Sequence, residues 1–589
     1  MAPAFWAACL ALAAIFPFAG NPAQAQQPSP VPQLTFKATD PNEKGDGTLS
    51  PAAREAIIHG PLPMSQADID AKAAANKAAD EALKARPQVA PPVRSWPRGA
   101  LEGETERPDL SIPGGINIQG QSDPNVFPSD STGAIGPFHF IQLINDKAGL
   151  YRANDRVLLA SGTLNDLANN LASTKTDPQI IFDNRSGRFY YTMIEIFSAV
   201  DNRLAFGFSK GAAPTDLSGS WCHYEIGYAT RFPDFPKLGD SPDFAIIGVK
   251  AFLPNITSNG GSTGLDLIGM RFAGADLIAI GKPPSGGTCP PASSFKIGAF
   301  FNLVDSDRNQ VWTPVPAHQI YGIPSHPDAP PAGFVIARDG GSQPFHNLWF
   351  FAVVTDFTGN PIFGSSRRLT VDSYGIPPAA AQLSGQKLDA ADARMTQAVQ
   401  AFRPIRGRHS FWTQHTIKNP IDDRFSVVRI YEIDPLPILR GPFFSPILLG
   451  SLTISDSSSS LFNAAVSPDR QAIGATENFG NNWVVEYNRS GPTMFPTISA
   501  ASALVEGPIQ FTNVVESGGP YIDTESCPNS GDMCRWGDYS GASPDPNPRG
   551  LGVSGSGVVW GTNQFSSGAT PPGTGPFRNW LTQIFALQP

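Results

Sequence analysis

The residues best suited to binding chemistry lie close together near the C-terminus, in the run Arg535-Trp-Gly-Asp-Tyr539. An exposed Trp536 ring could stack on the face of a sugar, while Arg535 and Asp538 hydrogen-bond its hydroxyl groups or a carboxylate. The same residues also suit a structural role, in which Trp536 is a buried anchor and the Arg–Asp pair fixes a turn. The sequence therefore predicts a ligand-binding group at Arg535, Trp536, Asp538 and Tyr539, with the buried anchor as the alternative.

Aspartates recur at turns that open strand-like units, at Asp130, Asp177, Asp234 and Asp538. If such turns meet at the centre of one domain, their carboxylates and nearby carbonyls could hold Ca²⁺, which takes about six to eight oxygen ligands. An aspartate in a turn also accepts hydrogen bonds from backbone N–H groups, and that role needs no metal. Calcium is therefore the candidate cofactor, with these four residues as its ligands and turn capping as the alternative.

Paired carboxylates suggest a second chemistry, glycoside hydrolysis, which requires two carboxyl groups about 5–10 Å apart. The chain offers three pairs by position: Asp177 with Asp183, Asp234 with Asp243, and Glu477 with Glu486. The chain contains no Gly-rich phosphate loop, no Gly-x-Ser-x-Gly elbow and no haem attachment motif. A polysaccharide hydrolase or lyase is therefore the enzymatic alternative to a binding protein.

The N-terminus has the features of an export signal. Residues 1–25 carry no charge, contain an apolar block and end in Ala23-Gln-Ala25, a small-x-small cleavage site. A membrane anchor is the alternative, but the apolar block is shorter than the ~20 residues of a bilayer span. Residues 26–113 form a Pro- and Ala-rich leader with one predicted helix over 65–86, whose apolar face is almost entirely alanine. We expect this helix to lie loosely on the surface, as part of a spacer or of an arm that docks a partner.

Four cysteines follow the signal: Cys222, Cys289, Cys527 and Cys534. No Cys-x-x-Cys motif or His/Cys cluster accompanies them, so a zinc site is not favoured. Cys527 and Cys534 bound a short loop rich in turn residues, which favours this local pair and leaves Cys222–Cys289 as a long-range disulfide. An even number of cysteines in an exported chain is typical of disulfides.

Charge and composition restrict the partners. The chain has 589 residues, a formal net charge of −9 and no run of Lys or Arg. Nucleic acid and anionic membrane surfaces are therefore poor partners. No segment after the signal is long and apolar enough to span a membrane. We expect a protein that is secreted to the periplasm, the cell surface or the medium.

The chain from residue 114 onward reads as one all-β domain over 114–589. Short aromatic or alternating segments recur between Gly, Pro, Asn and Asp turns, for example at 138–144, 189–194, 348–354 and 425–433. The turn aspartates recur at spacings near the ~40–50 residues of a propeller blade, which favours a β-propeller of about six to eight blades. A tandem of β-sandwiches is the competing fold. The Ala- and Gln-rich segment 379–402 is interpreted as an insertion with some helical character.

Four motifs point to a known group of proteins: 131–139, 177–188, 232–239 and 535–540. They resemble motifs of poorly characterised exported bacterial β-propeller proteins, which are loosely similar to the sialidase-like propellers. The resemblance covers most of the chain after residue 115 and implies a propeller fold and export. It implies no substrate, because function lies in sites and not in folds. Residues 402–405, Phe-Arg-Pro-Ile, differ in order from the sialidase motif Phe-Arg-Ile-Pro, which argues against sialidase activity.

These observations together predict a secreted β-propeller that acts in recognition at or outside the cell surface. The expected ligand is a glycan or a protein. The expected binding face carries the turn aspartates and the cluster from Arg535 to Tyr539.

Overall fold

The computed structural model describes residues 34–43, 66–85 and 116–589, apart from short stretches at 199–200, 229–230, 260–261, 285, 321–331, 385, 436–444, 471–479, 505–506, 526, 530–531, 548–556 and 571–576. The predicted signal at 1–25 lies outside the described residues, as does most of the leader. No helix in the described part of the chain has the length and apolar character needed to cross a bilayer.

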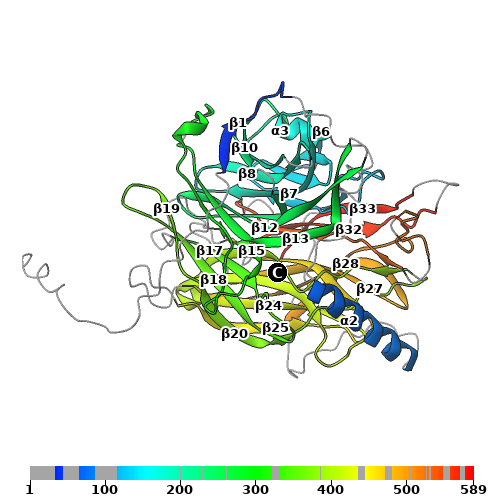
Figure 1. Ribbon diagram of the computed structural model, residues 1–589. Coiled ribbons are helices and arrows are strands. Elements are labelled where there is room, and N and C mark those ends of the chain that lie inside the picture. The colour runs from blue at the N-terminus through cyan, green and yellow to red at the C-terminus, as the bar shows by residue number, and fades with distance from the viewer. Residues whose placement is uncertain are drawn as a thin grey trace, which may run out of the picture.

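The described strands form a seven-bladed β-propeller (Figure 1). Blade 1 contains β3 (Thr132–Ile135), β4 (His139–Ile144), β5 (Lys147–Arg152) and β6 (Leu158–Thr163). Blade 2 contains β7 (Thr174–Asp183), β8 (Arg188–Ile196), β9 (Asn202–Ser209), β10 (Trp221–Gly227) and β1 (Thr35–Ala38). Blade 3 contains β11 (Phe232–Asp240), β12 (Phe244–Asn259), β13 (Ser262–Gly281) and β14 (Ile297–Phe300).

The remaining four blades follow in chain order. Blade 4 contains β15 (Trp312–Pro316), β17 (Ala332–Arg338), β18 (Phe345–Thr355), β19 (Pro361–Phe363) and β20 (Arg367–Tyr374). Blade 5 contains β22 (Met395–Arg403), β23 (Arg408–Lys418), β24 (Ser426–Asp434), β25 (Ile447–Ile454) and the parallel β16 (His318–Ile320). Blade 6 contains β26 (Ser460–Pro468), β27 (Trp483–Gly491), β28 (Met494–Ala503) and β29 (Ile509–Glu516). Blade 7 contains β31 (Gly541–Pro544), β32 (Val559–Ser566), β33 (Trp580–Leu587) and β2 (Asn117–Gln119).

Shorter elements connect or cover the blades. They are α2 (Gln66–Ala85), α3 (Leu164–Ala168), the 3-10 turns η2 (Ala292–Ser294) and η3 (Pro404–Arg406), and a two-stranded pair of β21 (Lys387–Leu388) with β30 (Met533–Cys534). α3 begins at Thr163, whose hydroxyl accepts the backbone N–H of Asp166 while the Asp166 carboxylate accepts the N–H of Thr163. This reciprocal cap satisfies donors that the first helical turn leaves open.

N-terminal strands complete two of the blades. β2 pairs antiparallel with β33, so blade 7 combines strands from both sides of the propeller sequence. Such closure joins the first and last blades and removes the sheet edges that an open ring would expose. β1 pairs with β10 and adds a fifth strand to blade 2.

Neighbouring blades pack against each other over buried apolar side chains. Blades 1 and 2 share a cluster that includes Ile141, Phe189 and Trp221. Blades 7 and 1 meet where Phe140 stacks on Trp560 with ring centroids 5.4 Å apart. The core is therefore divided into layers between blades, and the polar side chains of the inner strands face the central channel.

The Ala-rich helix is held more firmly than its sequence predicts. On α2, Asp68 is 2.8 Å from Arg338, and Lys72 is 2.9 Å from Asp389. All four side chains of these two ion pairs are nine-tenths buried or close to it. The expectation of a loosely attached helix is wrong, because it considered only the small apolar area that alanine buries and not buried ion pairs.

The segment 379–402 is not a helical insertion. It contributes β21 and most of β22, the inner strand of blade 5. An inner strand places small or polar side chains toward the channel, and Gln397 there donates to the carbonyl of Ala542 at 2.6 Å. The segment is rich in Ala and Gln because small and polar side chains suit a strand that faces the channel, and not because it forms a helix.

A left-handed residue lies just before or within the first four residues of six inner strands, and in four of them it lies inside a shift in strand register. These residues, with their φ values, are Asp130 (44°), Asp177 (55°), Phe235 (52°), Thr313 (55°), Ala393 (64°) and Asn463 (48°). Asp and Asn adopt this conformation more readily than other non-glycine residues. Part of the aspartate recurrence is therefore a backbone requirement.

Candidate functional site

Four aspartates predicted from the sequence come together at one end of the central channel. We name this end, where the inner strands begin, the acidic mouth, and we name Asp130, Asp177, Asp234 and Asp538 the acidic ring. Asp130 precedes β3, Asp177 lies in β7, Asp234 in β11, and Asp538 precedes β31. The Asp130 carboxylate accepts the backbone N–H of Asp538 at 2.7 Å, which joins blades 1 and 7.

Asn145, in the turn between β4 and β5, links two members of the acidic ring. Its amide nitrogen donates to the Asp130 carboxylate at 2.7 Å. Its amide oxygen accepts the backbone N–H of Asp177 at 2.9 Å and the hydroxyl of Thr176 at 3.0 Å. Both aspartates are thereby fixed in position by one buried side chain.

Aromatic rings, a lysine and an arginine fill the channel just inside the acidic mouth, and we name this region the throat. Tyr539 stacks on Phe235 with ring centroids 4.9 Å apart. The Lys237 amino group lies 3.7 Å from the Tyr539 ring centre, and the Arg394 guanidinium lies 4.5 Å from that of Phe235. The Tyr539 hydroxyl donates to Asp177 at 2.7 Å, so the stack is also bound to the acidic ring.

Two further ion pairs engage members of the acidic ring. Asp234 is 2.7 Å from the amino group of Lys250, a fully buried lysine of β12. Asp538 is 3.1 Å from Arg535. Among the described residues, neither Asp130 nor Asp177 forms an ion pair, and Asp177 is partly exposed.

Burial and mutual repulsion raise the pKa of three ring carboxyls. Burial raises the pKa of Asp130 well above its ordinary value, and the charges of Asp538 and Asp177 add to the effect. Burial, followed by the charge of Asp234, raises the pKa of Asp177 to about 6. Burial also raises the pKa of Asp538, against the opposing charge of Arg535. Raised pKa values favour the protonated forms of these three carboxyls at a pH where an ordinary aspartate is ionised.

The predicted cluster from Arg535 to Tyr539 is mostly internal. Trp536 is 1% exposed, its indole N–H donates to Asn488 at 2.8 Å, and its ring meets Tyr521 edge-on at 5.2 Å. Tyr539 is fully buried in the throat. Arg535 keeps 14% of its side-chain surface exposed. The Trp536 ring thus has the geometry of the anchor alternative, and a sugar does not stack on it in this conformation.

Both predicted disulfides are present. Cys222 in β10 bonds Cys289, ahead of β14, and so links blades 2 and 3. Cys527 bonds Cys534 beside the Trp536 cluster. Disulfides of this kind persist in oxidising compartments, which is the property expected of a protein outside the cytosol.

The carboxylate pairs suggested for glycoside hydrolysis are separated. Asp177 and Asp183 lie six residues apart along β7. At ~3.3 Å per residue, this separates them by about 20 Å. Asp234 and Asp243 flank most of β11 in the same way. Glu477 lies outside the described residues, and Glu486 is buried in β27. The carboxylates that do converge come from different blades.

No group of three or more His, Cys, Asp or Glu side chains with metal-binding geometry occurs among the described residues. In the acidic ring, Asp234 and Asp538 already contact cationic side chains. Calcium therefore stays a proposal for this ring.

Sequence reasoning missed the cations and the amide that hold the acidic mouth together. Lys237 lies inside the motif 232–239, and Arg394 lies in the segment interpreted as an insertion. Lys250 and Asn145 carry no local signature, because their roles depend on neighbours from other strands or other blades. Only Arg394 could have been found from the sequence. Assigning 395–403 as a strand would have placed Arg394 at the start of an inner strand.

No protein-family model and no curated protein matches this chain. Among solved structures, it is similar to a Synechocystis apocarotenoid oxygenase variant at 12% identity and a TM-score of 0.35, over 66% of this chain and 72% of the other. An exo-β-1,3-galactanase from Clostridium thermocellum matches at 10% identity and a TM-score of 0.26, over 81% and 99%. An endo-arabinase from Bacteroides thetaiotaomicron matches at 12% identity and a TM-score of 0.23, over 58% and 95%. At these identities and TM-scores, no activity is transferred to this chain.

Proposed function

We propose that this protein is a secreted propeller that recognises a glycan at its acidic mouth, outside the cell or at its surface. Arg535, Asp538 and Asp177 contact the ligand, while Trp536 and Tyr539 hold them in position. The observation that supports this most is the filled throat. Because an aromatic stack, a buried lysine and an arginine occupy the channel, a ligand meets a fixed polar surface and not a passage.

The chemistry of this surface suits sugar hydroxyls. A carboxylate accepts and a guanidinium donates, so one sugar can bond to both at once. The Arg535 side chain uses one nitrogen on Asp538, and its Nε and Nη1 have no hydrogen-bond partner among the described residues. A ligand hydroxyl or carboxylate that reaches them would satisfy buried donors, which otherwise carry a desolvation penalty. A protein ligand is the second partner class that such a surface accepts.

Hydrolysis or lysis of a polysaccharide is the second candidate function, and one observation favours it. Asp177 is partly exposed, its pKa is raised to about 6, and Asn145 holds both it and Asp130. A carboxyl with that pKa exchanges protons near neutral pH, as a general acid requires. In this scheme Asp177 is the proton donor and an ionised ring neighbour is the second carboxylate.

Calcium at the acidic ring is a further proposal. A bound cation would lower the raised carboxyl pKa values of Asp130, Asp177 and Asp538, because it stabilises their ionised forms. Thermal unfolding of the purified protein with added Ca²⁺ and with EDTA tests it. Stabilisation by Ca²⁺ that Asp130→Asn removes supports the site, and identical melting under both conditions contradicts it.

The recognition proposal is tested by retention of the purified secreted chain on a panel of immobilised polysaccharides and sialylated glycans, with product release assayed in parallel. Arg535→Ala should weaken retention by at least about tenfold, the equivalent of ~1.4 kcal/mol for a charged hydrogen bond. Arg152→Ala is the matched control, since Arg152 also pairs with an aspartate three residues later but lies on the surface away from the ring.

Each outcome separates the candidates. Retention without turnover that depends on Arg535 and Asp177 supports glycan recognition. Product release that Asp177→Asn abolishes replaces recognition with the hydrolase or lyase function. Equal retention by the Arg535 and Arg152 variants, or no retention at all, removes the glycan site and directs the search to protein ligands.

A further inference from the structure

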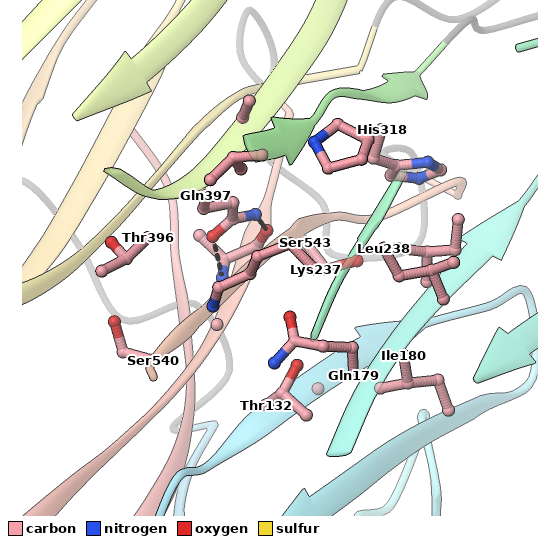
Figure 2. A pocket seen from close by; sticks show the side chains of 17 residues that line it. Thr132, Gln179, Ile180, Lys237, Leu238, His318, Thr396, Gln397, Ser540 and Ser543 are labelled. Carbon is pink, nitrogen blue, oxygen red and sulfur yellow. Dashed lines mark hydrogen bonds between the residues drawn. The ribbon is translucent and has the colours of Figure 1, made fainter. Parts of the chain in front are cut away.

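A small cavity lies deeper in the channel than the acidic ring. The inner strands enclose a cavity with ≈ 40 Å³ of space for the centres of water molecules. Among the residues that line it are Thr132, Gln179, Lys237, His318, Thr396 and Gln397 (Figure 2). A water needs about 10–15 Å³ by this measure, so the cavity accepts a molecule of roughly three or four non-hydrogen atoms.

Lys237 differs from the other buried lysines of the propeller. Its side chain is 2% exposed, and its amino group makes no hydrogen bond or ion pair with any described residue. Its closest features are the ring faces of Tyr539 at 3.7 Å and Phe235 at 4.4 Å. By contrast, Lys250 is 2.7 Å from Asp234, and Lys282 is within 2.8 Å of two aspartates.

The absence of a direct counter-ion favours the neutral amine. Burial lowers the pKa of Lys237 well below its ordinary value, and the more distant charges of Asp130, Asp177 and Asp538 offset this only in part. Arg394 acts in the same direction as burial. Desolvation beside another cation is the environment in which a lysine becomes a nucleophile near neutral pH.

His318 gives a second, independent sign of a ligand. It is 6% exposed, and its Nδ1 is 2.9 Å from the Asp240 carboxylate, which assigns the Nδ1–H tautomer from the hydrogen bond. In this tautomer Nε2 is a hydrogen-bond acceptor, and it has no partner among the described residues. His318 also lines the cavity. A buried imidazole nitrogen without a partner is rare, and a hydroxyl group in the cavity would satisfy it.

We propose that this cavity is a covalent binding site for short aldehydes, which Lys237 holds as a Schiff base. The amine lone pair attacks the carbonyl carbon, and the carbonyl π electrons and one amine proton give the hydroxyl of a carbinolamine. Loss of that hydroxyl with the second amine proton releases one water and leaves the C=N bond. A short aldehyde such as glycolaldehyde fits the space. The site is separate from the ligand surface at the acidic mouth.

The test is reductive trapping on the full secreted chain. The protein is incubated with glycolaldehyde and cyanoborohydride at neutral pH, and peptide mass spectrometry reports adduct occupancy at each lysine. Lys237 should carry several-fold more adduct than Lys250, because the carboxylate of Asp234 holds the Lys250 amine in its protonated form and Lys237 has no such partner. Lys250 is the matched control, since it is equally buried but ion-paired.

Two variants complete the design. Lys237→Arg should abolish the internal adduct, and His318→Phe, which fills part of the cavity with an apolar ring, should lower the occupancy by glycolaldehyde and acetaldehyde alike. Modification restricted to exposed lysines, or equal modification of Lys237 and Lys250, would overturn the proposal. Because the wild-type comparison of the two lysines is decisive alone, the test holds even if a variant fails to fold.

Discussion

Removal of the Cys222–Cys289 disulfide should destabilise the propeller more than removal of Cys527–Cys534. The first bond joins residues 67 positions apart and the second joins residues 7 apart. The chain-entropy relation for these loops gives about 4.4 and about 2.4 kcal/mol at 25 °C, respectively. The long-range bond also links blade 2 to blade 3, so its loss frees two blades to separate in the unfolding ensemble.

The comparison uses paired Cys→Ala variants. Alanine is preferred to serine because Cys222, Cys527 and Cys534 are fully buried and a serine hydroxyl there would add its own penalty. Urea unfolding followed by tryptophan fluorescence gives the free energies. With an unfolding entropy of ~1 kcal/mol/K for a domain of this size, the melting temperature should fall by ~4 °C and ~2 °C.

The order of the two effects is the decisive result. If the Cys527/Cys534 variant loses as much stability as the Cys222/Cys289 variant, or more, loop entropy is not the dominant contribution. Packing around the buried Trp536 cluster would then account for the difference, because the short loop borders that cluster. Identical melting of all three proteins would show that neither bond constrains the unfolded chain.

Three further predictions follow from the described contacts. Asp68→Ala leaves the buried Arg338 without its ion-pair partner, which should cost about 3–5 kcal/mol of stability. We therefore expect α2 to detach and become sensitive to proteases. Asp70→Ala, on the exposed face of α2, should leave protease resistance unchanged. Asp177 has a folded pKa near 6, raised from an ordinary 3.8, so its ionisation lowers wild-type stability as the pH rises from about 4 to about 6. Asp177→Asn should remove this decline and be more stable at pH 7 by up to about 3 kcal/mol in denaturant unfolding; an unchanged pH profile contradicts the raised pKa. Trp536→Phe loses the indole hydrogen bond to its amide partner and should cost about 1–2 kcal/mol, and an unchanged free energy of unfolding would show that this bond does not anchor the cluster.

Much of the fold could be predicted because its signals are local. Strand segments alternate or carry aromatic residues, and turn residues bound them, so an all-β propeller follows from patterns within a few residues. The segment 379–402 was misassigned because an inner strand that faces a polar channel lacks the apolar alternation of other strands. The attachment of α2 was missed because buried ion pairs with Arg338 and Asp389 leave no trace in the helix's own sequence.

The candidate site could be predicted only in part. Asp130 and Asp177 were recognisable because left-handed backbone positions favour Asp and so repeat along the chain. Their surroundings were not recognisable, since Asn145, Lys237 and Arg394 reach the site from other strands. The exposure of Trp536 was equally undetermined, because burial depends on how blades meet.

Residue type and short-range spacing were enough to predict most of the blade-forming strands, to favour the two disulfide pairs and to point to the four aspartates of the acidic ring. The number of blades, the filling of the throat and the lack of a counter-ion for Lys237 follow from the assembled ring and could not be predicted from local patterns. The physical reason is that closing the ring brings residues hundreds of positions apart within hydrogen-bonding distance, as Asp130 and Asp538 show. Burial and charge at such contacts, which set the chemistry of the site, exist only once all seven blades are in place.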